Sequence, residues 1–466
     1  MGDVNRVVGA RMLALLLGLS AAAGWMNAAS ADVGLSKDGI TGGWGYKTDD
    51  VNLTFYGVLD VGVGTLTHSY PASADFASTV NPYNLNSSPH SFTGPYNGGI
   101  SMNRVGIEGD KKFGPDLYDV DAFFKVESAI NPLYLTLSNN GQSIINDIHG
   151  LSRANGASAI DGQMFSRAAY AGLSRSDFGA IEFGRTTNFS LDQVVQYDPV
   201  QAALLFSPLG FSGGIGGGLG ATENTRLDNS LKYENRIHTA DFAGKDMGSV
   251  DFGFQYKFAT SNTDQEAESA YVAMLGYNYG PFSLKGTYSQ TYNTVAYATQ
   301  YSNVVAPDPN LTIENTRGYM ITGKYQITPE ATVKIGWEDT NVTAPSNQGL
   351  TGIDRYYGMT LPHTAVNATG RQTFGTFWVG GDYKILENLD VGAGYYNINT
   401  YNTPEVGKQY RANIFSVLVD YTIIRGLDTY FGAMIERYSG IGLTKKAPVD
   451  AFSANNMIGA GIRLKF

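Results

Sequence analysis

The sequence is organised by a strict alternation of apolar and polar residues that recurs along almost its whole length. Alternation with a period of two indicates a β-strand whose two faces meet different surroundings. In the last segment, one face carries Ile458, Ala460, Ile462, Leu464 and Phe466, and the other carries Gly459, Gly461, Arg463 and Lys465. A soluble sheet can alternate in the same way, so the number of such segments decides the interpretation.

Many alternating segments can be traced, with turn and loop residues between them. We predict strands near residues 51–66, 99–109, 117–128, 164–174, 178–187, 226–237, 248–260, 269–280, 281–293, 315–327, 331–341, 372–385, 388–400, 409–423, 427–438 and 455–466. Strands of about 9–11 residues are long enough for a tilted crossing of a lipid bilayer.

The connections between these segments alternate in length. Short ones, such as 175–177 and 328–330, follow the even strands. Long polar ones tend to follow the odd strands, and they include 67–98, 129–163, 188–225 and 342–371. Bacterial outer-membrane barrels combine an even strand number with short periplasmic turns and longer external loops. We therefore predict an all-β, 16-stranded antiparallel transmembrane barrel; a soluble sandwich or solenoid is not expected to show either regularity.

The N-terminal residues resemble a secretory signal. Arg6 and Arg11 precede an apolar run, and a small-residue site follows at Ala29-Ser30-Ala31. That run is shorter than the roughly 20 residues that a spanning helix needs, although a retained anchor is the alternative. We predict a signal peptide at 1–31, an N-terminal extension at 32–50 of uncertain structure (a periplasmic segment or a short extra strand), and a barrel domain at 51–466.

The amino-acid composition indicates where the protein is located and which kinds of partner it can bind. The chain has 30 Tyr and 23 Phe, residue types that outer-membrane barrels place in girdles at both membrane interfaces. It has no Cys, which excludes disulfides, and its formal net charge of −10 argues against a nucleic-acid partner. Together with the alternation, these features favour a barrel in the outer membrane.

Several segments resemble the general porins of Gram-negative bacteria, in particular the trimeric β-proteobacterial type. The matching segments are Leu53 to Asp60, Asn103 to Gly109, Phe124 to Glu127, Arg167 to Leu173, Asp177 to Arg185, Arg226 to Tyr233 and the terminal Phe466. Each segment is weak evidence alone, but their order and spacing cover nearly the whole predicted mature chain. The extension at 32–50 is not part of the family pattern.

The resemblance implies a homotrimer in the outer membrane, in which each barrel encloses its own water-filled pore. It also implies that the third external loop, 188–225, folds inward and narrows the channel. The implied partners are outer-membrane lipids, the barrel-assembly machinery, and small hydrophilic solutes and ions. In this family a terminal aromatic residue such as Phe466 forms part of the assembly signal.

A porin acts through geometry and electrostatics, because rings of charged side chains bias the sign of the ion admitted. By resemblance, the constriction arginines are Arg104, Arg167, Arg185 and Arg226. The loop 188–225 offers only Asp192, Asp198 and Glu223 against them. Alternation places a second set of charged residues on the lumen side, namely Glu108, Lys125, Glu127, Asp228 and Lys232. We expect a modest preference for anions.

Alternation conflicts with two of these assignments. Arg167 shares its register with Ala169 and Leu173, and Arg185 shares its register with Phe183, which are residues expected to face lipid. A charge facing lipid near the bilayer midplane costs about 2–4 kcal/mol. A β-bulge near each rim would turn both arginines inward. The competing interpretation makes all four arginines structural wall residues with no influence on selectivity.

No enzymatic, metal or cofactor site is predicted. The five histidines, His68, His90, His149, His238 and His363, all fall in predicted connections without ligand spacing. The glycine-rich tract at 216–221 lacks the flanking parallel strand and helix of a dinucleotide site. The favoured function is a general diffusion porin. A substrate-selective barrel of similar architecture, and a barrel used as an enzyme or adhesin, are the alternatives.

Overall fold

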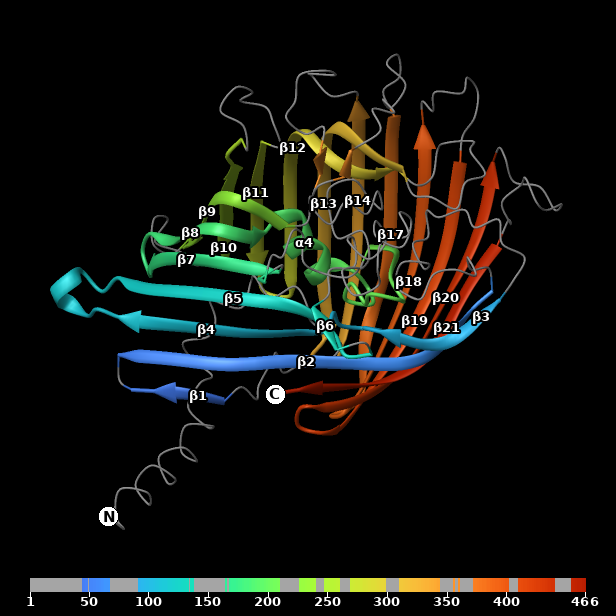
Figure 1. Ribbon diagram of the computed structural model, residues 1–466, viewed down its shortest axis with the longest axis horizontal. Helices are drawn as coiled ribbons and strands as arrows, with labels where there is room; N and C mark the ends of the chain where they lie inside the picture. Colours follow the sequence, from blue (N-terminus) through green and yellow to red (C-terminus); the bar gives the residue numbers. More distant parts are fainter. Residues whose placement is uncertain are drawn as a thin grey trace, which may run out of the picture.

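The computed structural model describes residues 44–48, 50–67, 91–133, 135–137, 164–165, 167–209, 226–239, 247–259, 269–298, 310–343, 355–356, 359–360, 372–401, 410–440 and 454–466. They form a closed antiparallel barrel with 16 strand positions, drawn in Figure 1. Each strand pairs with its neighbour along the chain, and the last pairs with the first.

The first half of the wall consists of β2 (Val51–Leu66), β3 (Phe92–Asn97) continued by β4 (Arg104–Lys112), β5 (Asp121–Asn131), β7 (Ala168–Arg175), β8 (Gly179–Thr187), β9 (Arg226–His238), β10 (Ser249–Lys257) and β11 (Ala270–Tyr279). The second half consists of β12 (Phe282–Ala298), β13 (Asn310–Thr328), β14 (Ala331–Thr343), β17 (Gln372–Leu386), β18 (Leu389–Tyr401), β19 (Tyr410–Ile424), β20 (Leu427–Gly440) and β21 (Ala454–Lys465). The predicted barrel is therefore confirmed, with most strand boundaries within a few residues.

Smaller elements accompany the wall. β6 (Thr136–Leu137) extends the pairing of β5, and η2 (Pro115–Leu117) lies in the turn after β4. β15 (Arg355–Tyr356) and β16 (Met359–Thr360) form a separate two-stranded ladder. Among the described residues, no helix has the length and apolar character needed to cross a membrane.

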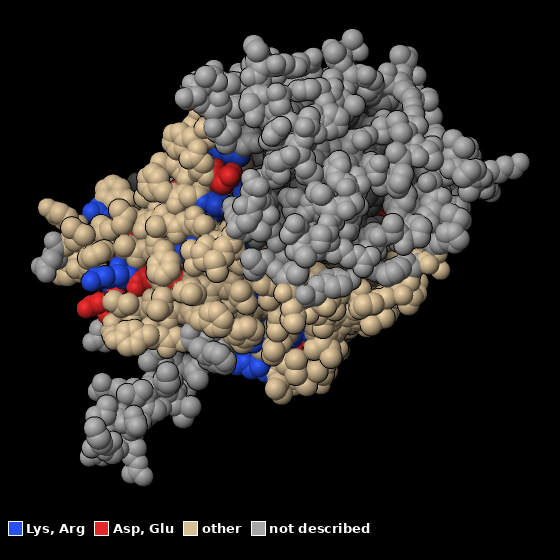
Figure 2. Space-filling view, viewed as in Figure 1, with Lys and Arg blue, Asp and Glu red and all other residues tan. Residues whose placement is uncertain are grey.

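The outer face of the barrel is apolar, as the alternation predicts. Its exposed side chains include Leu275, Ile321, Ile335, Phe415 and Phe431. Uncharged side chains dominate the described surface in Figure 2, and the charged ones gather in small groups of both signs. Such a surface is suited to contact with lipid.

Aromatic residues mark two levels on this face. Ring contacts join Tyr271 to Tyr288 and Tyr292, and Tyr288 to Tyr319, with centroids 5.1–6.3 Å apart. A second group of exposed aromatic residues, which includes Tyr279 and Phe282, lies at the short turns. This arrangement fits the interfacial girdles of outer-membrane barrels.

The first and last described strands, β1 and β21, meet along one edge of β2 at the closing seam. β21 pairs with the half of β2 from Val58 to Leu66, and the Phe466 carbonyl and amide both hydrogen-bond to Gly57, at 2.8 and 3.0 Å. β1 (Trp44–Lys47) then pairs with Asn52 to Phe55, further along the same edge. Part of the extension 32–50 is thus a short extra strand, one of the two forms considered for it.

The second wall position is interrupted, whereas the sequence predicted one continuous strand at 99–109. Residues 98–103 leave the ladder between β3 and β4, after Gly98 with a φ of 79° that favours glycine. The Asn103 side chain takes over the lost ladder bonds. Its amide donates to the Asp60 carbonyl at 2.7 Å, and its side-chain oxygen accepts from the Asp60 amide.

A helix that the sequence analysis did not predict follows β8. This helix, α4 (Phe189–Tyr197), begins at Asn188, whose side chain accepts a hydrogen bond from the Leu191 amide at 2.8 Å. Gln193 donates to the Lys285 carbonyl at 3.0 Å and to the Thr322 hydroxyl at 2.9 Å. Because Thr322 alternates with exposed Ile321, α4 lies against the inner face of β12 and β13 (Figure 1).

Residues 198–209 continue from α4 along the inner face of the second half of the wall. The Trp378 indole donates to the Tyr197 carbonyl at 3.1 Å, and the Phe206 and Tyr430 rings lie 6.2 Å apart. The Leu205 amide donates to the Gly99 carbonyl at 2.9 Å, which joins this segment to the interruption at 98–103. These contacts form the largest buried apolar cluster of the described residues, with Val194, Val200, Leu205, Phe206, Trp378, Tyr396, Ile414, Leu418 and Met434 among its members.

Candidate pore constriction

The opposite inner wall carries an arginine-rich group around Glu127 on β5. The Glu127 carboxylate is 3.3 Å from Arg104 Nε and 2.6 Å from Arg167 Nε, and it accepts the Tyr56 hydroxyl at 2.7 Å. All three charged residues are almost completely buried. We call Arg104, Arg167, Arg185 and Arg226, with Glu127, the constriction cluster.

The structure brings Arg167 into this cluster although its register is that of lipid-facing residues. β7 begins at Ala168, so Arg167 lies just before the strand, where alternation no longer fixes its direction. The Arg167 guanidinium bonds to Glu127 and also donates to Met102 Sδ at 2.7 Å. Its side chain therefore points away from lipid.

The irregularity expected near Arg185 is present. The β8–β9 register shifts between Gly184 and Thr186, because β9 has one residue more than β8 at this place. Asn229, in the irregular part of β9, has a φ of 47°. Arg185 is buried, and its guanidinium is 3.5 Å from the Arg226 carbonyl. The electrostatic neighbours of Arg226 are Arg167, Arg185, Glu127 and Arg104. All four predicted arginines thus gather at one place.

The remaining predicted lumen residues form ion pairs near this cluster. Lys125 Nζ lies 3.3 Å from Glu108 and 5.0 Å from the centre of the Tyr56 ring. Asp228 pairs with Lys257 across the β9–β10 ladder at 2.9 Å. These pairs place Glu108 and Lys125 on the same inner wall as Arg104.

Asp192 on α4 faces the same wall. Its carboxylate is 2.8 Å from Lys232 Nζ, which also donates to the Thr187 carbonyl at 3.2 Å. Lys232 Nζ lies 4.7 Å from the centre of the Phe189 ring. The pair therefore connects α4 to β8 and β9, on the side of the constriction cluster.

Asp198 occupies a different environment from Asp192. It is completely buried, and its carboxylate accepts the Tyr396 hydroxyl and the Ala202 amide, both at 2.6 Å. Burial raises the pKa of this carboxyl group above its ordinary value. These contacts hold residues 198–202 against β18 and favour an anchoring role for Asp198. Glu223, the third predicted loop acid, lies outside the described residues.

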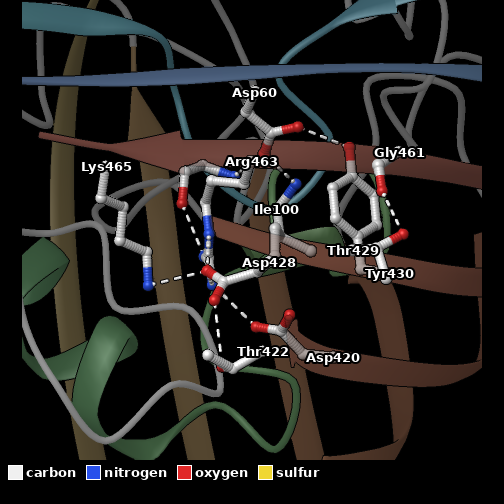
Figure 3. Close-up of polar contacts among 11 residues, drawn as sticks. Asp60, Ile100, Asp420, Thr422, Asp428, Thr429, Tyr430, Gly461, Arg463 and Lys465 are labelled. Atoms are coloured by element: carbon white, nitrogen blue, oxygen red, sulfur yellow. Dashed lines mark hydrogen bonds and ion pairs between the residues drawn. The ribbon is translucent and has the colours of Figure 1, made fainter. Parts of the chain in front are cut away.

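A second charged group, the seam cluster, lies on the inner face beside the closing seam (Figure 3). Arg463 on β21 donates to Asp428 and Asp420, each at 2.7 Å, and to the Ser101 hydroxyl at 3.0 Å. Lys465 Nζ is 3.0 Å from Asp428. These residues and Asp60 make up the cluster.

Asp60 connects the seam cluster to the interruption in the second wall position. Its carboxylate accepts the backbone amides of Ile100 and Ser101, at 2.9 and 2.7 Å, and the Tyr430 hydroxyl. The carboxylate therefore stabilises the inward turn of residues 98–103 (Figure 3).

Sequence reasoning missed several inner-face residues. Tyr56 and Glu182 were not singled out, and neither were Lys285, Lys324 and Lys334, although each alternates with outward apolar residues. That alternation was a usable signal for the three lysines. No comparable signal marked the anchoring contact between Asp198 and Tyr396, because the two residues are far apart in the sequence.

The described residues contain no group of three or more His, Cys, Asp or Glu side chains that could hold a metal ion. Of the five histidines only His238 is described, at the end of β9. The described contacts of the inner face are ion pairs, hydrogen bonds and apolar packing. Such a surface can attract, orient and exclude solutes.

Solved structures of similar fold include an anion-selective porin and an outer membrane protein. The anion-selective porin from Comamonas acidovorans has a TM-score of 0.60 at 14% identity, over 90% of this chain and 100% of that one. The trimer form of OmpT from Vibrio cholerae has a TM-score of 0.54 at 17% identity, over 90% of this chain and 100% of that one. At these identities the likeness shows the barrel fold.

The sequence comparisons carry the family assignment. An outer membrane porin protein of Bordetella pertussis (strain Tohama I) is 24% identical over an alignment of 446 positions that covers 92% of this chain and 97% of the relative. The family model of Gram-negative porins matches residues 13–440. The chain therefore belongs to the Gram-negative porin family, and it is a diffusion channel of the outer membrane rather than an enzyme.

Proposed function

We propose that the channel is narrowest between the constriction cluster and the loop 188–225, and that it passes small hydrophilic solutes with a modest preference for anions. The observation that carries this proposal is the gathering of Arg104, Arg167 and Arg185 around Arg226, with Glu127 among them. Because low-dielectric walls focus the field at a narrow aperture, an excess of arginine there would raise the local anion concentration.

Two features of the described part of the loop support its place in the proposal. α4 and residues 198–209 lie against the inner wall from β12 to β20, opposite the strands that carry the arginines. Asp192 is held by Lys232, and Asp198 is buried beneath the loop. The loop therefore brings little free negative charge toward the arginines within the described residues. Residues 210–225 lie outside them.

We propose that three barrels assemble as a homotrimer, as in the trimer form of OmpT, whose fold is similar. Residues 1–31 would direct export to the outer membrane. Phe466, whose ring packs 6.0 Å from Phe55 beside the seam, would form part of the signal read by the barrel-assembly machinery. Lipids would contact the apolar outer face.

The proposal is tested by the reversal potential of channels reconstituted in a planar bilayer under a KCl gradient. The wild-type channel should prefer chloride, and Arg104→Ala with Arg226→Ala should reduce that preference. Arg411→Ala is the matched control, since Arg411 lies on the outward register of β19 and is exposed. A wild-type preference for potassium would overturn the proposed selectivity. An unchanged reversal potential in the double variant would assign the arginines a purely structural role.

A further inference from the structure

Three lysines lie at one level on three consecutive strands. Lys285 is the fourth residue of β12, Lys334 is the fourth residue of β14, and Lys324 is the fifth residue from the end of β13. Lys324 and Lys334 are direct partners in the β13–β14 ladder, and Ser283 is the partner of Lys324 on β12. The lysines therefore form a row near the short-turn end of the barrel.

The row lies on the inner face. The residues that alternate with the lysines, Leu284, Tyr325, Val333 and Ile335, are large and exposed on the outer face. α4 runs toward the row, since Gln193 contacts Thr322 while Tyr197 contacts Ser283, nearer the short turn. The row thus lies below the constriction cluster, on the side of the short periplasmic turns.

The three lysines differ in how their charges are balanced. Lys334 Nζ is 2.6 Å from Asp382 and donates to the Asp198 carbonyl at 3.2 Å. Lys285 Nζ donates to the neutral Gln196 side chain at 3.2 Å. Among the described residues, Lys285 also has Asp251, Asp192 and Glu234 as electrostatic neighbours.

Of the three lysines, Lys324 has the least negative charge near it. Its electrostatic neighbours are Lys334, Lys285, Asp382 and Arg236, so the one carboxylate among them is already paired with Lys334. Arg236 is likewise paired, with Asp251 at 2.5 Å. Lys324 Nζ lies 5.2 Å from the centre of the Tyr197 ring, and no carboxylate of the described chain is paired with it. Like charges placed directly opposite each other on a sheet are destabilising.

We propose that Lys285, Lys324 and Lys334 form an anion subsite on the periplasmic side of the constriction, which takes small oxyanions of charge −2 such as phosphate or a dicarboxylate. This inference rests on the proposed anion preference and extends it to a second place in the channel. Each ammonium group has three donors. The contacts described above engage one donor of Lys285 and none of Lys324, and the Lys324 side chain is partly exposed. A doubly charged oxyanion relieves the repulsion between neighbouring lysines better than chloride does.

The probe for this subsite is inorganic phosphate, added to channels that carry a chloride current at constant ionic strength. Phosphate should reduce the wild-type current, and Lys324→Gln should raise the half-blocking concentration about tenfold, the usual effect of losing one charge-assisted hydrogen bond. Lys324→Arg, which keeps the charge, should retain most of the block. A chloride current near the wild-type value shows that each variant has folded.

The matched control is Lys112→Gln. Lys112 ends β4, lies on the inward register at the same end of the barrel, and is exposed on the opposite wall. It should leave the half-blocking concentration unchanged. The subsite is refuted if wild-type current shows no phosphate block, or if Lys324→Gln and Lys112→Gln behave alike. The reversal potential in phosphate-free KCl tests the proposed function separately, because it depends on the arginines.

Discussion

Two buried charged clusters of the described inner wall differ in the sign of their excess charge: basic residues outnumber acidic ones in the constriction cluster, and the reverse holds in the seam cluster. In the constriction cluster, Arg104 and Arg167 share the carboxylate of Glu127, and Arg185 and Arg226 lie beside them. In the seam cluster, Arg463 is shared between Asp420 and Asp428, with Lys465 and Asp60 beside them. Both clusters lie on the inner side of the wall, and beside each of them a tyrosine donates to one of its carboxylates.

The difference shows that burial of an arginine does not by itself identify a pore residue. Arg463 is 0% exposed, and the carboxylates around it balance its charge. Arg226 is 9% exposed, and three of its four strongest neighbours are other arginines. An unbalanced group of like charges is costly unless water or mobile counter-ions reach it. The excess of one sign is therefore the better guide to the aperture.

The strongest test of this comparison is Arg463→Met. It leaves Asp420 and Asp428 buried without their shared partner, and the loss of one member of a buried pair costs about 3–5 kcal/mol. We expect a clear fall in the thermal stability of the folded barrel, measured by its loss of β-structure in circular dichroism. The channels that still fold should keep the wild-type reversal potential.

Arg463→Lys is the matched control for that variant, because it retains the charge and part of the contact with Asp428. It should lose less stability than Arg463→Met. If Arg463→Met instead altered ion selectivity at unchanged stability, the seam cluster would belong to the aperture and the comparison would fail.

Glu127→Gln should have a smaller effect on folding but a direct effect on selectivity. It removes the carboxylate that Arg104 and Arg167 share, so the field at the aperture becomes more positive. We expect the chloride-to-potassium permeability ratio to rise about twofold, a change of the order that one partly screened charge produces. Reversal potentials measure this ratio. A fall in the ratio would contradict the placement of the cluster at the aperture.

Removal of the two tyrosine hydroxyls tests the comparison of the clusters with the smallest expected effects. Tyr56→Phe removes the hydroxyl that donates to Glu127, and Tyr430→Phe removes the one that donates to Asp60. Each change should cost about 1–3 kcal/mol, because a buried acceptor loses a partner. Tyr430→Phe should lower only thermal stability, whereas Tyr56→Phe should also shift the reversal potential slightly. Identical behaviour of the two variants would remove the functional distinction between the clusters.

The sequence predicts the strands of the wall well, because the alternation of apolar and polar residues within each strand is a local property. Residues 51–66 appear as β2 with the predicted limits. The interruption at 98–103 was not predicted, because it depends on bonds between Asn103 and Asp60 that replace ladder bonds over a long sequence separation. Local sequence patterns carry no information on where side-chain hydrogen bonds take the place of ladder bonds.

In the candidate site, too, local patterns predict some residues and miss those whose position depends on contacts distant in the sequence. Arg104, Glu127 and Lys125 could be assigned to the inner face from alternation alone. Arg185 could not, because its direction depends on an irregularity whose extra residue lies on the neighbouring strand β9. The helix α4 did have a local signal, an Asn188 cap followed by apolar residues at Leu191, Val194 and Val195. That signal lay in a region interpreted only as a glycine-bearing loop.

The seam at β2 has a consequence for chain connectivity. Phe466 lies opposite Gly57, and Trp44 lies opposite Phe55, so β21 and β1 follow one another in the same direction along a single edge. A covalent link between these two segments would need to bridge only the place opposite Tyr56. The barrel is therefore suited to circular permutation. A chain opened at the turn between β11 and β12, and joined from Phe466 to Trp44 without residues 1–43, could keep every described ladder, and β21 and β1 would become one strand.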